Sequence, residues 1–209
     1  EVKRALEAAE QVPFSAAVIS LGLNHSAWDE AAIEHSLTAI EHLKAFAAPL
    51  GVRLLLANGE NEVTTPEHLL YIVKAGHFDS VGVSLDVGHL HLAQDAAVAG
   101  RAEEQAVRAA SPWVESAVTL LGARIAQVHL HDNHGAFSDS ADMKDEHLWP
   151  GEGAIDWPAV AAALAPLPAA TPGILDVAGD REQPADAITR RAEAAFRTLE
   201  EQGSVQAAK

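Results

Sequence analysis

Three short stretches of the sequence combine histidines and carboxylates at spacings that suit a metal site. They are LDVGH with Asp86 and His89, QVHLHDN with His129 and His131, and KDEHLWPGEG with Asp145 and His147. Carboxylate oxygens and neutral imidazole nitrogens are good ligands for Zn, Mn or Co. The chain has no cysteine, so any metal must be held by His, Asp or Glu. By themselves the stretches leave three interpretations open: a metal site, a hydrogen-bonded polar layer and a solvated loop.

The positions of the histidines along the predicted strands indicate which of them are candidate metal ligands. His129 and His131 are two residues apart and point to the same side of a strand. Burying two imidazoles without partners is costly, so we expect His129 to be a ligand, and His131 and His134 to belong to a polar layer. In LDVGH we expect the strand to end in a turn at Gly88, which frees Asp86 and His89 from strict alternation.

Apolar patterning predicts strands that alternate with helices. Helices are predicted at 1–12, 29–51, 65–76, 95–121, 156–167 and 184–202, and strands within 14–23, 52–58, 81–89, 123–132 and 172–179. Asp29, Thr65 and Asp156 are the expected N-caps. Nearly continuous apolar strands indicate a parallel sheet covered by helices, hence an α/β fold. Polar residues at the strand ends favour a (β/α)₈ barrel, where such ends form one mouth, over an open doubly wound sheet.

Charge and segment composition limit the partners. Lys and Arg total 14 against 30 Asp and Glu, a formal net charge of −16 that repels a phosphate backbone, so nucleic acid is not an expected partner. No apolar run is long enough to span a bilayer and no signal segment is recognisable, so we expect a cytoplasmic protein without a membrane partner. One domain is expected over residues 1–202 with a polar tail at 203–209, and a homo-oligomer remains open.

The strings LDVGH, VHLHDN, DEHLWPGEGAIDW and ILDV, in this order, closely resemble the xylose isomerase-like TIM barrel superfamily. That superfamily includes sugar phosphate isomerases and epimerases and the apurinic (AP) endonuclease family 2. The resemblance runs from Glu1 to about Gln202. It implies a TIM (β/α)₈ barrel of which this sequence holds about five βα units, matching the fourth to the eighth, so that about three N-terminal strands are expected to be absent.

The resemblance also implies roles for individual residues. Asp86, His129 and Asp176 match the ligands of a central divalent metal, which would be Mn, Zn, Co or Mg. His89, Asp145 and His147 match ligands of a further metal in the endonuclease branch, and in sugar-converting members these positions often contact the substrate. The implied catalytic residues are Asp176 and His147, and the implied substrate-binding residues are His89, His131 and Asn58.

The sequence departs from the family pattern at three strand ends. Ala57 stands where members usually have a glutamate that binds metal and transfers protons, Ser20 stands where a histidine is common, and Asp176 replaces a glutamate. General acid/base catalysis is worth about 10²–10⁴-fold, so the loss at Ala57 should impair the ordinary reaction unless Glu60 or Glu62 replaces the group.

Three functions remain open. The first is a metal-dependent sugar or sugar-phosphate isomerase or epimerase with impaired or altered chemistry. The second is a non-catalytic sugar-binding relative. The third is an AP endonuclease-like metal phosphodiesterase, which the net charge and the changes at Ser20 and Ala57 disfavour.

Overall fold

The computed structural model describes residues 2–23, 26–99, 113–135, 145–178 and 183–201. The chain divides into two compact units, residues 1–84 and residues 85–209. Strand β3, Gly82–Asp86, is the segment in which the chain passes from the first unit to the second.

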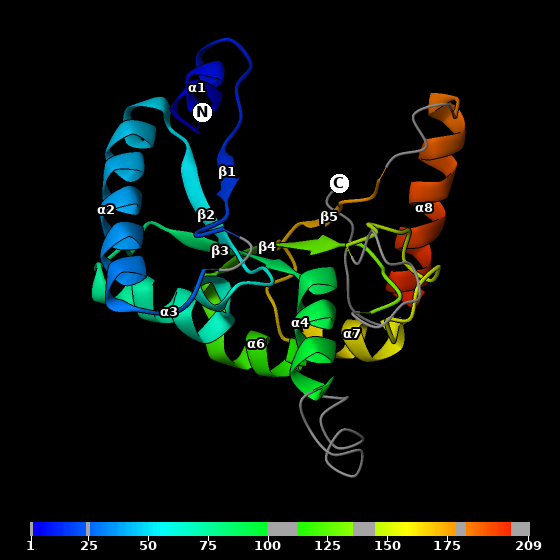
Figure 1. Cartoon of the computed structure of the whole chain (residues 1–209). Helices are drawn as coiled ribbons and strands as arrows, with labels where there is room; N and C mark the ends of the chain where they lie inside the picture. Colours follow the sequence, from blue (N-terminus) through cyan, green and yellow to red (C-terminus); the bar gives the residue numbers. More distant parts are fainter. Residues whose placement is uncertain (1, 24–25, 100–112, 136–144, 179–182, 202–209) are drawn as a thin grey trace. The chain divides into compact units, whose positions relative to one another are not determined.

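Three parallel strands form the sheet of the first unit (Figure 1). Strand β2, Arg53–Ala57, pairs with β1, Ala16–Ile19, on one side and with β3 on the other. In this register Ile19 lies opposite Leu56, and Ala57 lies opposite Ser84. Leu54 to Ala57 are all buried, as expected for a central strand covered on both faces.

The three α-helices of the first unit begin within one residue of the predicted positions, and a short 3₁₀ helix, η3 (Glu62–Thr64), was not predicted. The helices of this unit are α1 (Val2–Glu7), η1 (Ala8–Glu10), α2 (Glu30–Ala47), η2 (Ala48–Leu50), η3 and α3 (Pro66–Ala75). Asp29 caps α2 by accepting a hydrogen bond from the Ala32 amide at 2.8 Å, and Thr65 caps α3. Helix α2 packs against β2 and α3, with Ile40 and Ile72 fully buried. The predicted caps Asp29 and Thr65 are therefore confirmed.

The second unit contains the parallel pair β4, Ile125–Leu130, and β5, Gly173–Leu175. Leu130 lies opposite Leu175 at the carboxyl ends of the two strands. The amide of Asp176 donates to the carbonyl of Leu130 at 3.1 Å, which extends the ladder by one residue. This bond holds Asp176 beside the end of β4.

The helices of the second unit are α4 (Val87–Ala99), α6 (Trp113–Leu121), η4 (Gly122–Arg124), α7 (Trp157–Leu164) and α8 (Ala185–Glu201). Helix α4 follows β3 directly, so the predicted turn at Gly88 is wrong: Gly88 lies in the first helical turn. Asp156 caps α7 as predicted, accepting from the Ala159 amide at 3.2 Å. Of the predicted helix 95–121, residues 100–112 lie outside the described residues, as does the predicted tail at 203–209.

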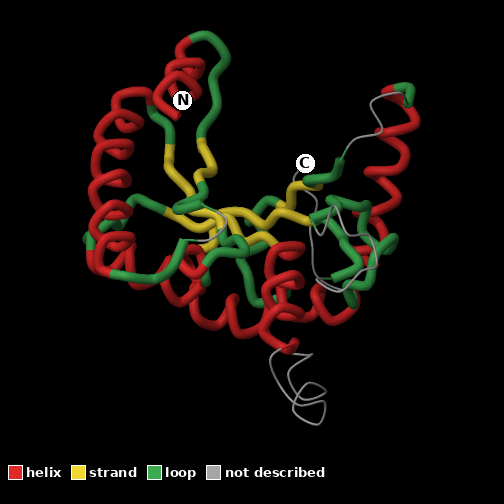
Figure 2. The backbone as a smooth tube through the Cα atoms, in the orientation of Figure 1, coloured by secondary structure: helices red, strands yellow, loops and turns green. Residues whose placement is uncertain are grey.

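Helices and strands alternate along the chain, as Figure 2 shows in red and yellow. The predicted α/β class with parallel strands is confirmed. In the described part of the chain, no helix combines the length and the apolar character that crossing a membrane requires.

Candidate metal centre

Seven histidine and aspartate side chains of the second unit form two groups of metal-ligating atoms. We call Asp86, His129 and Asp176 the strand group, and His89, His131, Asp145 and His147 the loop group. Within each group the ligand atoms lie within 4.8 Å of one another. The strand group comes from the ends of β3, β4 and β5, whereas the loop group comes from the first turn of α4, the residue after β4 and the segment before α7.

His129 is the central member of the strand group. Its Nδ1 atom lies 3.1 Å from Asp176 Oδ2 and 3.9 Å from Asp86 Oδ2. Its Nε2 atom lies 2.9 Å from Nε2 of Gln127, an amide nitrogen that donates, so here Nδ1 of His129 carries the proton and donates to Asp176. With the Gln127 amide turned over, its oxygen would accept from Nε2, and Nδ1 would present its lone pair to the two carboxylates. The Asp176 side chain is 45% exposed and so is open to an incoming molecule.

Asp86 links the two groups. Burial raises the pKa of Asp86. The hydrogen bond with His131 and the charges of His89 and His131 lower this pKa by more than burial raises it, so the net shift is downward. The ionised carboxylate only accepts hydrogen bonds, and its Oδ1 atom lies 2.9 Å from both the His89 amide and Nε2 of His131. Nε2 of His131 therefore carries the proton, and Nδ1 of this ring keeps its lone pair.

Asp145 lies among the three imidazoles of the loop group. Its Oδ2 atom is 3.1 Å from Nε2 of both His89 and His147. Nδ1 of His147 donates to the Asp176 carbonyl at 2.6 Å, so Nε2 of His147 carries the lone pair that faces Asp145. Burial raises the pKa of Asp145, but the hydrogen bond with His89 and the charges of His89, His147 and His131 lower it to about 2.

Two buried atoms of the loop group have no hydrogen-bond partner among the described residues: Nδ1 of His131 and Oδ1 of Asp145. They lie 3.9 Å apart, which is less than the sum of two metal–ligand bonds of about 2.0–2.2 Å each. Two acceptor atoms at this distance need a cation between them, because each has lost its hydration. The donor set and this spacing fit a divalent metal such as Zn, Mn or Co.

Protons are the other cation that could satisfy these atoms. The rings of His131 and His147 are stacked, with centroids 3.9 Å apart and an angle of 10° between planes, so protonating both would place like charges close together. A single proton on Nδ1 of His131 would point toward Oδ1 of Asp145, but the 3.9 Å between these atoms is too long for a hydrogen bond. Two metal–ligand bonds of about 2.0–2.2 Å span that distance, so the separation fits a metal better than a proton.

The backbone around the loop group is held in an uncommon conformation. His147 has φ of +49°, in the left-handed region that a non-glycine residue adopts at a cost of about 1–3 kcal/mol. The next residue, Leu148, exchanges two backbone hydrogen bonds of 2.8 Å with Asp132, an isolated antiparallel bridge. This bridge holds the strained residue in place.

Gly88 makes room for His131. A Cβ atom on Gly88 would lie 2.1 Å from Cε1 and 2.4 Å from Nδ1 of the His131 ring. The ring is fully buried and hydrogen-bonded to Asp86, so it has no free space into which to move. Sequence reasoning missed this requirement, and it also placed His131 outside the ligand set, although the ring contributes an atom to the loop group.

Four further positions considered in the sequence lie in the first unit. Asn58, predicted to bind substrate, follows β2 directly and is 1% exposed, and Ala57 ends β2 and is buried. Glu62, a candidate to replace the missing glutamate, accepts a hydrogen bond from the Trp28 amide at 2.9 Å. Glu60 is exposed. Glu62 is thus engaged in holding a loop.

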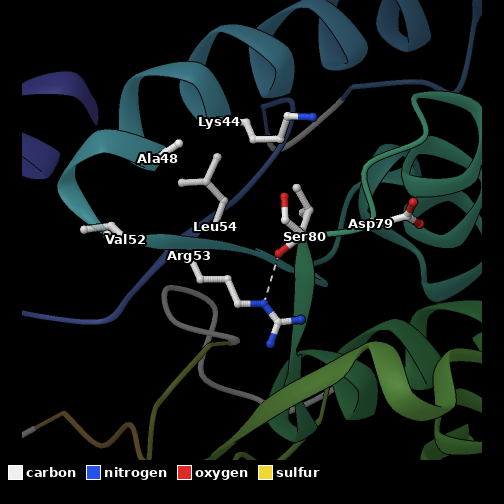
Figure 3. A pocket seen from close by; sticks show the side chains of 9 residues that line it. Lys44, Ala48, Val52, Arg53, Leu54, Asp79 and Ser80 are labelled. Atoms are coloured by element: carbon white, nitrogen blue, oxygen red, sulfur yellow. Dashed lines mark hydrogen bonds between the residues drawn. The ribbon is translucent and has the colours of Figure 1, made fainter.

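The first unit also contains a cavity of about 460 Å³ at the amino ends of β2 and β3 (Figure 3). Arg53 crosses it, donating from Nε to the Ser80 carbonyl at 3.0 Å, while the Lys44 amine lies apart from the guanidinium. Barrel active sites are built at the carboxyl ends of the strands, so this cavity lies at the end of the sheet that serves stability.

Comparison with known families decides the fold. The sequence pattern of the family described as xylose isomerase-like TIM barrel matches residues 1–199. The chain belongs to this family. The predicted resemblance and the predicted TIM barrel, present here as about five βα units, are confirmed.

A relative and two solved structures are similar to this chain. An uncharacterized protein of Methanocaldococcus jannaschii is 28% identical over 163 residues, which cover 75% of this chain and 48% of the relative. The IolI protein with a bound zinc atom has a TM-score of 0.66 at 22% identity, over 94% of this chain and 66% of the other. The 3-keto-D-glucoside 4-epimerase of E. coli has a TM-score of 0.63 at 17% identity, over 94% and 69%. The chain thus spans about half the length of its curated relative and about two thirds of these structures.

Proposed function

We propose that this protein is a metal-dependent, isomerase- or epimerase-like protein acting on a sugar or sugar phosphate, with chemistry altered by the loss at Ala57. The observation that carries the proposal is the pair of imidazole lone pairs, on His131 and His147, that face the ionised carboxylate of Asp145. We propose one ion in the strand group and a second in the loop group. The zinc atom bound to the IolI protein supports metal binding in this fold.

The strand group would hold the ion next to the substrate. A divalent metal there would polarise the carbonyl and hydroxyl oxygens of a bound sugar and stabilise an enediolate. Asp176 is the proposed proton-transfer residue, because its carboxylate is the most exposed of the group. His147 and His89 would act through the ion of the loop group.

Ala57 makes this chemistry one-sided. Epimerisation removes a proton on one face of the carbon and returns one on the other, which requires an acid/base group on each face. In the family the second group is the glutamate at the position of Ala57, and Glu62 is already bound to the Trp28 amide. Asp176 alone should therefore remove a proton and return one to the same face. The expected reaction is hydrogen exchange with solvent that exceeds inversion.

Deuterium exchange tests the proposal directly. Protein loaded with Mn or Zn is incubated with a panel of ketoses and ketose phosphates in heavy water, and NMR follows deuterium uptake and stereochemistry separately. We expect exchange to exceed epimerisation, His129→Ala to lose both exchange and the strand-group ion, and Asp176→Asn to lose exchange. Asp186→Asn is the matched control, because Asp186 is exposed on α8, where it pairs with Arg190, and belongs to neither ligand group. Bound metal without exchange on any sugar would defeat the catalytic proposal.

A non-catalytic sugar-binding relative is the second candidate, favoured by the buried methyl group of Ala57 at the end of β2. Ala57→Glu distinguishes the two. If the parent binds metal and sugar without exchange and the variant gains epimerisation, the protein is a binding relative that lost one group. If the parent already exchanges, Ala57→Glu should instead shift the balance toward inversion. No metal uptake from added Mn or Zn would defeat the metal-dependent proposal.

A further inference from the structure

Asp132 and Asn133 follow His131 and are both completely buried, yet neither belongs to a ligand group. Buried polar side chains are costly unless they are hydrogen-bonded, so their partners indicate what they do. The partners of these two residues lie on different segments of the second unit. Each of those segments carries a ligand of the loop group.

Asp132 holds the segment that follows His147. Its carboxylate accepts hydrogen bonds from the Gly151 amide at 2.8 Å, the Ile155 amide at 3.1 Å and the Trp157 indole N–H at 2.8 Å. The backbone N–H of Asn133 also donates to this carboxylate, at 2.9 Å, so each of its two oxygens accepts two hydrogen bonds. Through its own backbone Asp132 pairs with Leu148, the residue next to His147. Side chain and backbone together fix the course of this segment.

Asn133 holds the first turn of α4. Its Nδ2 atom donates to the Gly88 carbonyl at 3.1 Å, and its Oδ1 atom lies 2.7 Å from Nδ1 of His91. Gly88 and His91 flank His89 on this helix. The side chain of Asn133 therefore fixes the turn from which His89 reaches Asp145.

The strand group is held by other contacts. Asp86 and His129 belong to strands β3 and β4, and the Asp176 amide is bonded to the Leu130 carbonyl. Within the described residues, the side-chain hydrogen bonds of Asp132 and Asn133 go to other segments than these three ligands and their strands. These two side chains thus support the segments of the loop group, although bonds from His131 and His147 join the two groups.

We propose that Asp132 and Asn133 are positioning residues for the loop group, aligning His147 and His89 around its ion while the ion of the strand group binds without them. This inference rests on the proposed metal centre. Loss of a residue that orients metal ligands typically lowers metal affinity by about 10–100-fold. We expect that fall for the loop-group ion and less than a threefold change for the strand-group ion.

Two substitutions of unchanged size test the proposal. Asp132→Asn turns one acceptor oxygen into a donor that faces two N–H groups, and Asn133→Asp puts a carboxylate oxygen 3.1 Å from the Gly88 carbonyl. Cobalt and zinc binding are measured by titration against a chelator, with metal per chain counted by elemental analysis and the Co absorption spectrum recorded. The parent is expected to bind two ions per chain and each variant to retain one tightly. Trp157→Phe removes one bond to Asp132 and provides a milder variant, with a smaller fall for the same ion.

Matched controls separate positioning from general destabilisation. Asp156→Asn keeps an equally good helix cap in the same segment. Asn61→Asp removes a donor to a backbone carbonyl, that of Leu21, in the unit without candidate ligands. Both controls should retain two ions. Variants at Asp132, Asn133 and Trp157 that keep both ions at the parent affinity, or lose both equally, would overturn the inference. A parent that binds no ion overturns the proposed metal centre itself.

Discussion

The imidazole rings of His131 and His147 stack 3.9 Å apart. In each ring one nitrogen is bonded to an acceptor: Nε2 of His131 and Nδ1 of His147. Asp86 accepts from His131, and the backbone carbonyl of Asp176 accepts from His147. The remaining nitrogens, Nδ1 of His131 and Nε2 of His147, therefore carry lone pairs, and they face the carboxylate of Asp145. Histidine ligands are typically oriented by a hydrogen bond from the other ring nitrogen to a carboxylate or carbonyl, which is the arrangement of both rings here.

Gly88→Ala should abolish binding at the loop group. The new Cβ would lie 2.1 Å from the His131 ring, and the buried ring must leave its bond to Asp86 to relieve the contact. We expect at least a ~100-fold loss of affinity for the loop-group ion, measured by chelator competition. Gly76→Ala is the matched control, because its Cβ would lie 2.3 Å from the Phe78 ring in the first unit. That variant should be less stable but bind both ions, and a Gly88→Ala protein that also keeps both would refute the steric argument.

Local signals in the sequence were sufficient for most of the fold. The caps at Asp29, Thr65 and Asp156 and the five strands follow from residue type and apolar spacing within a short window. The start of α4 at Val87 was missed, although Asp86, the last residue of β3, accepts a hydrogen bond from the His89 amide as an N-cap does. Asp86 was assigned to the strand end and to the metal site, so the sequence favoured a turn at Gly88.

The site was predictable in part. The resemblance identified the ligands of both groups except His131. Nδ1 of His131 can bind a metal because Nε2 of the same ring donates to Asp86, which is 45 residues away in the sequence. The supporting roles of Asp132 and Asn133 depend on partners 19 to 45 residues away, such as Gly151 and Gly88. Spacing along one strand carries no information about such contacts. The roles of all these residues stay predictions.

Asp145 should stabilise the metal-free protein above about pH 4 and lose this contribution in acid. Its pKa is lowered from 3.8 to about 2, so the folded state favours the charged form. A lowered pKa adds stability above the unfolded value, and that stability disappears as the pH falls through the folded value. With a third of the side chain exposed, solvent screening leaves on the order of 1 kcal/mol. Urea unfolding of metal-free parent and Asp145→Asn should differ at pH 5 and converge near pH 2, and a constant difference would contradict the assignment.

His147→Asn tests whether the loop group needs the imidazole or only the backbone conformation. Asparagine tolerates the left-handed region better than most residues, so the substitution should preserve φ near +49° while removing the ring. His77 supplies the matched control, because it is exposed, has φ of +52° and belongs to neither ligand group. We expect His147→Asn to lose at least ~10-fold in affinity for the loop-group ion and His77→Asn to lose none, by the same chelator competition. Thermal unfolding of the metal-free proteins should shift by only a few degrees in both variants, since the left-handed backbone is kept. Unchanged ion binding in His147→Asn would show that this imidazole is not a ligand and that Asp145 is neutralised in another way.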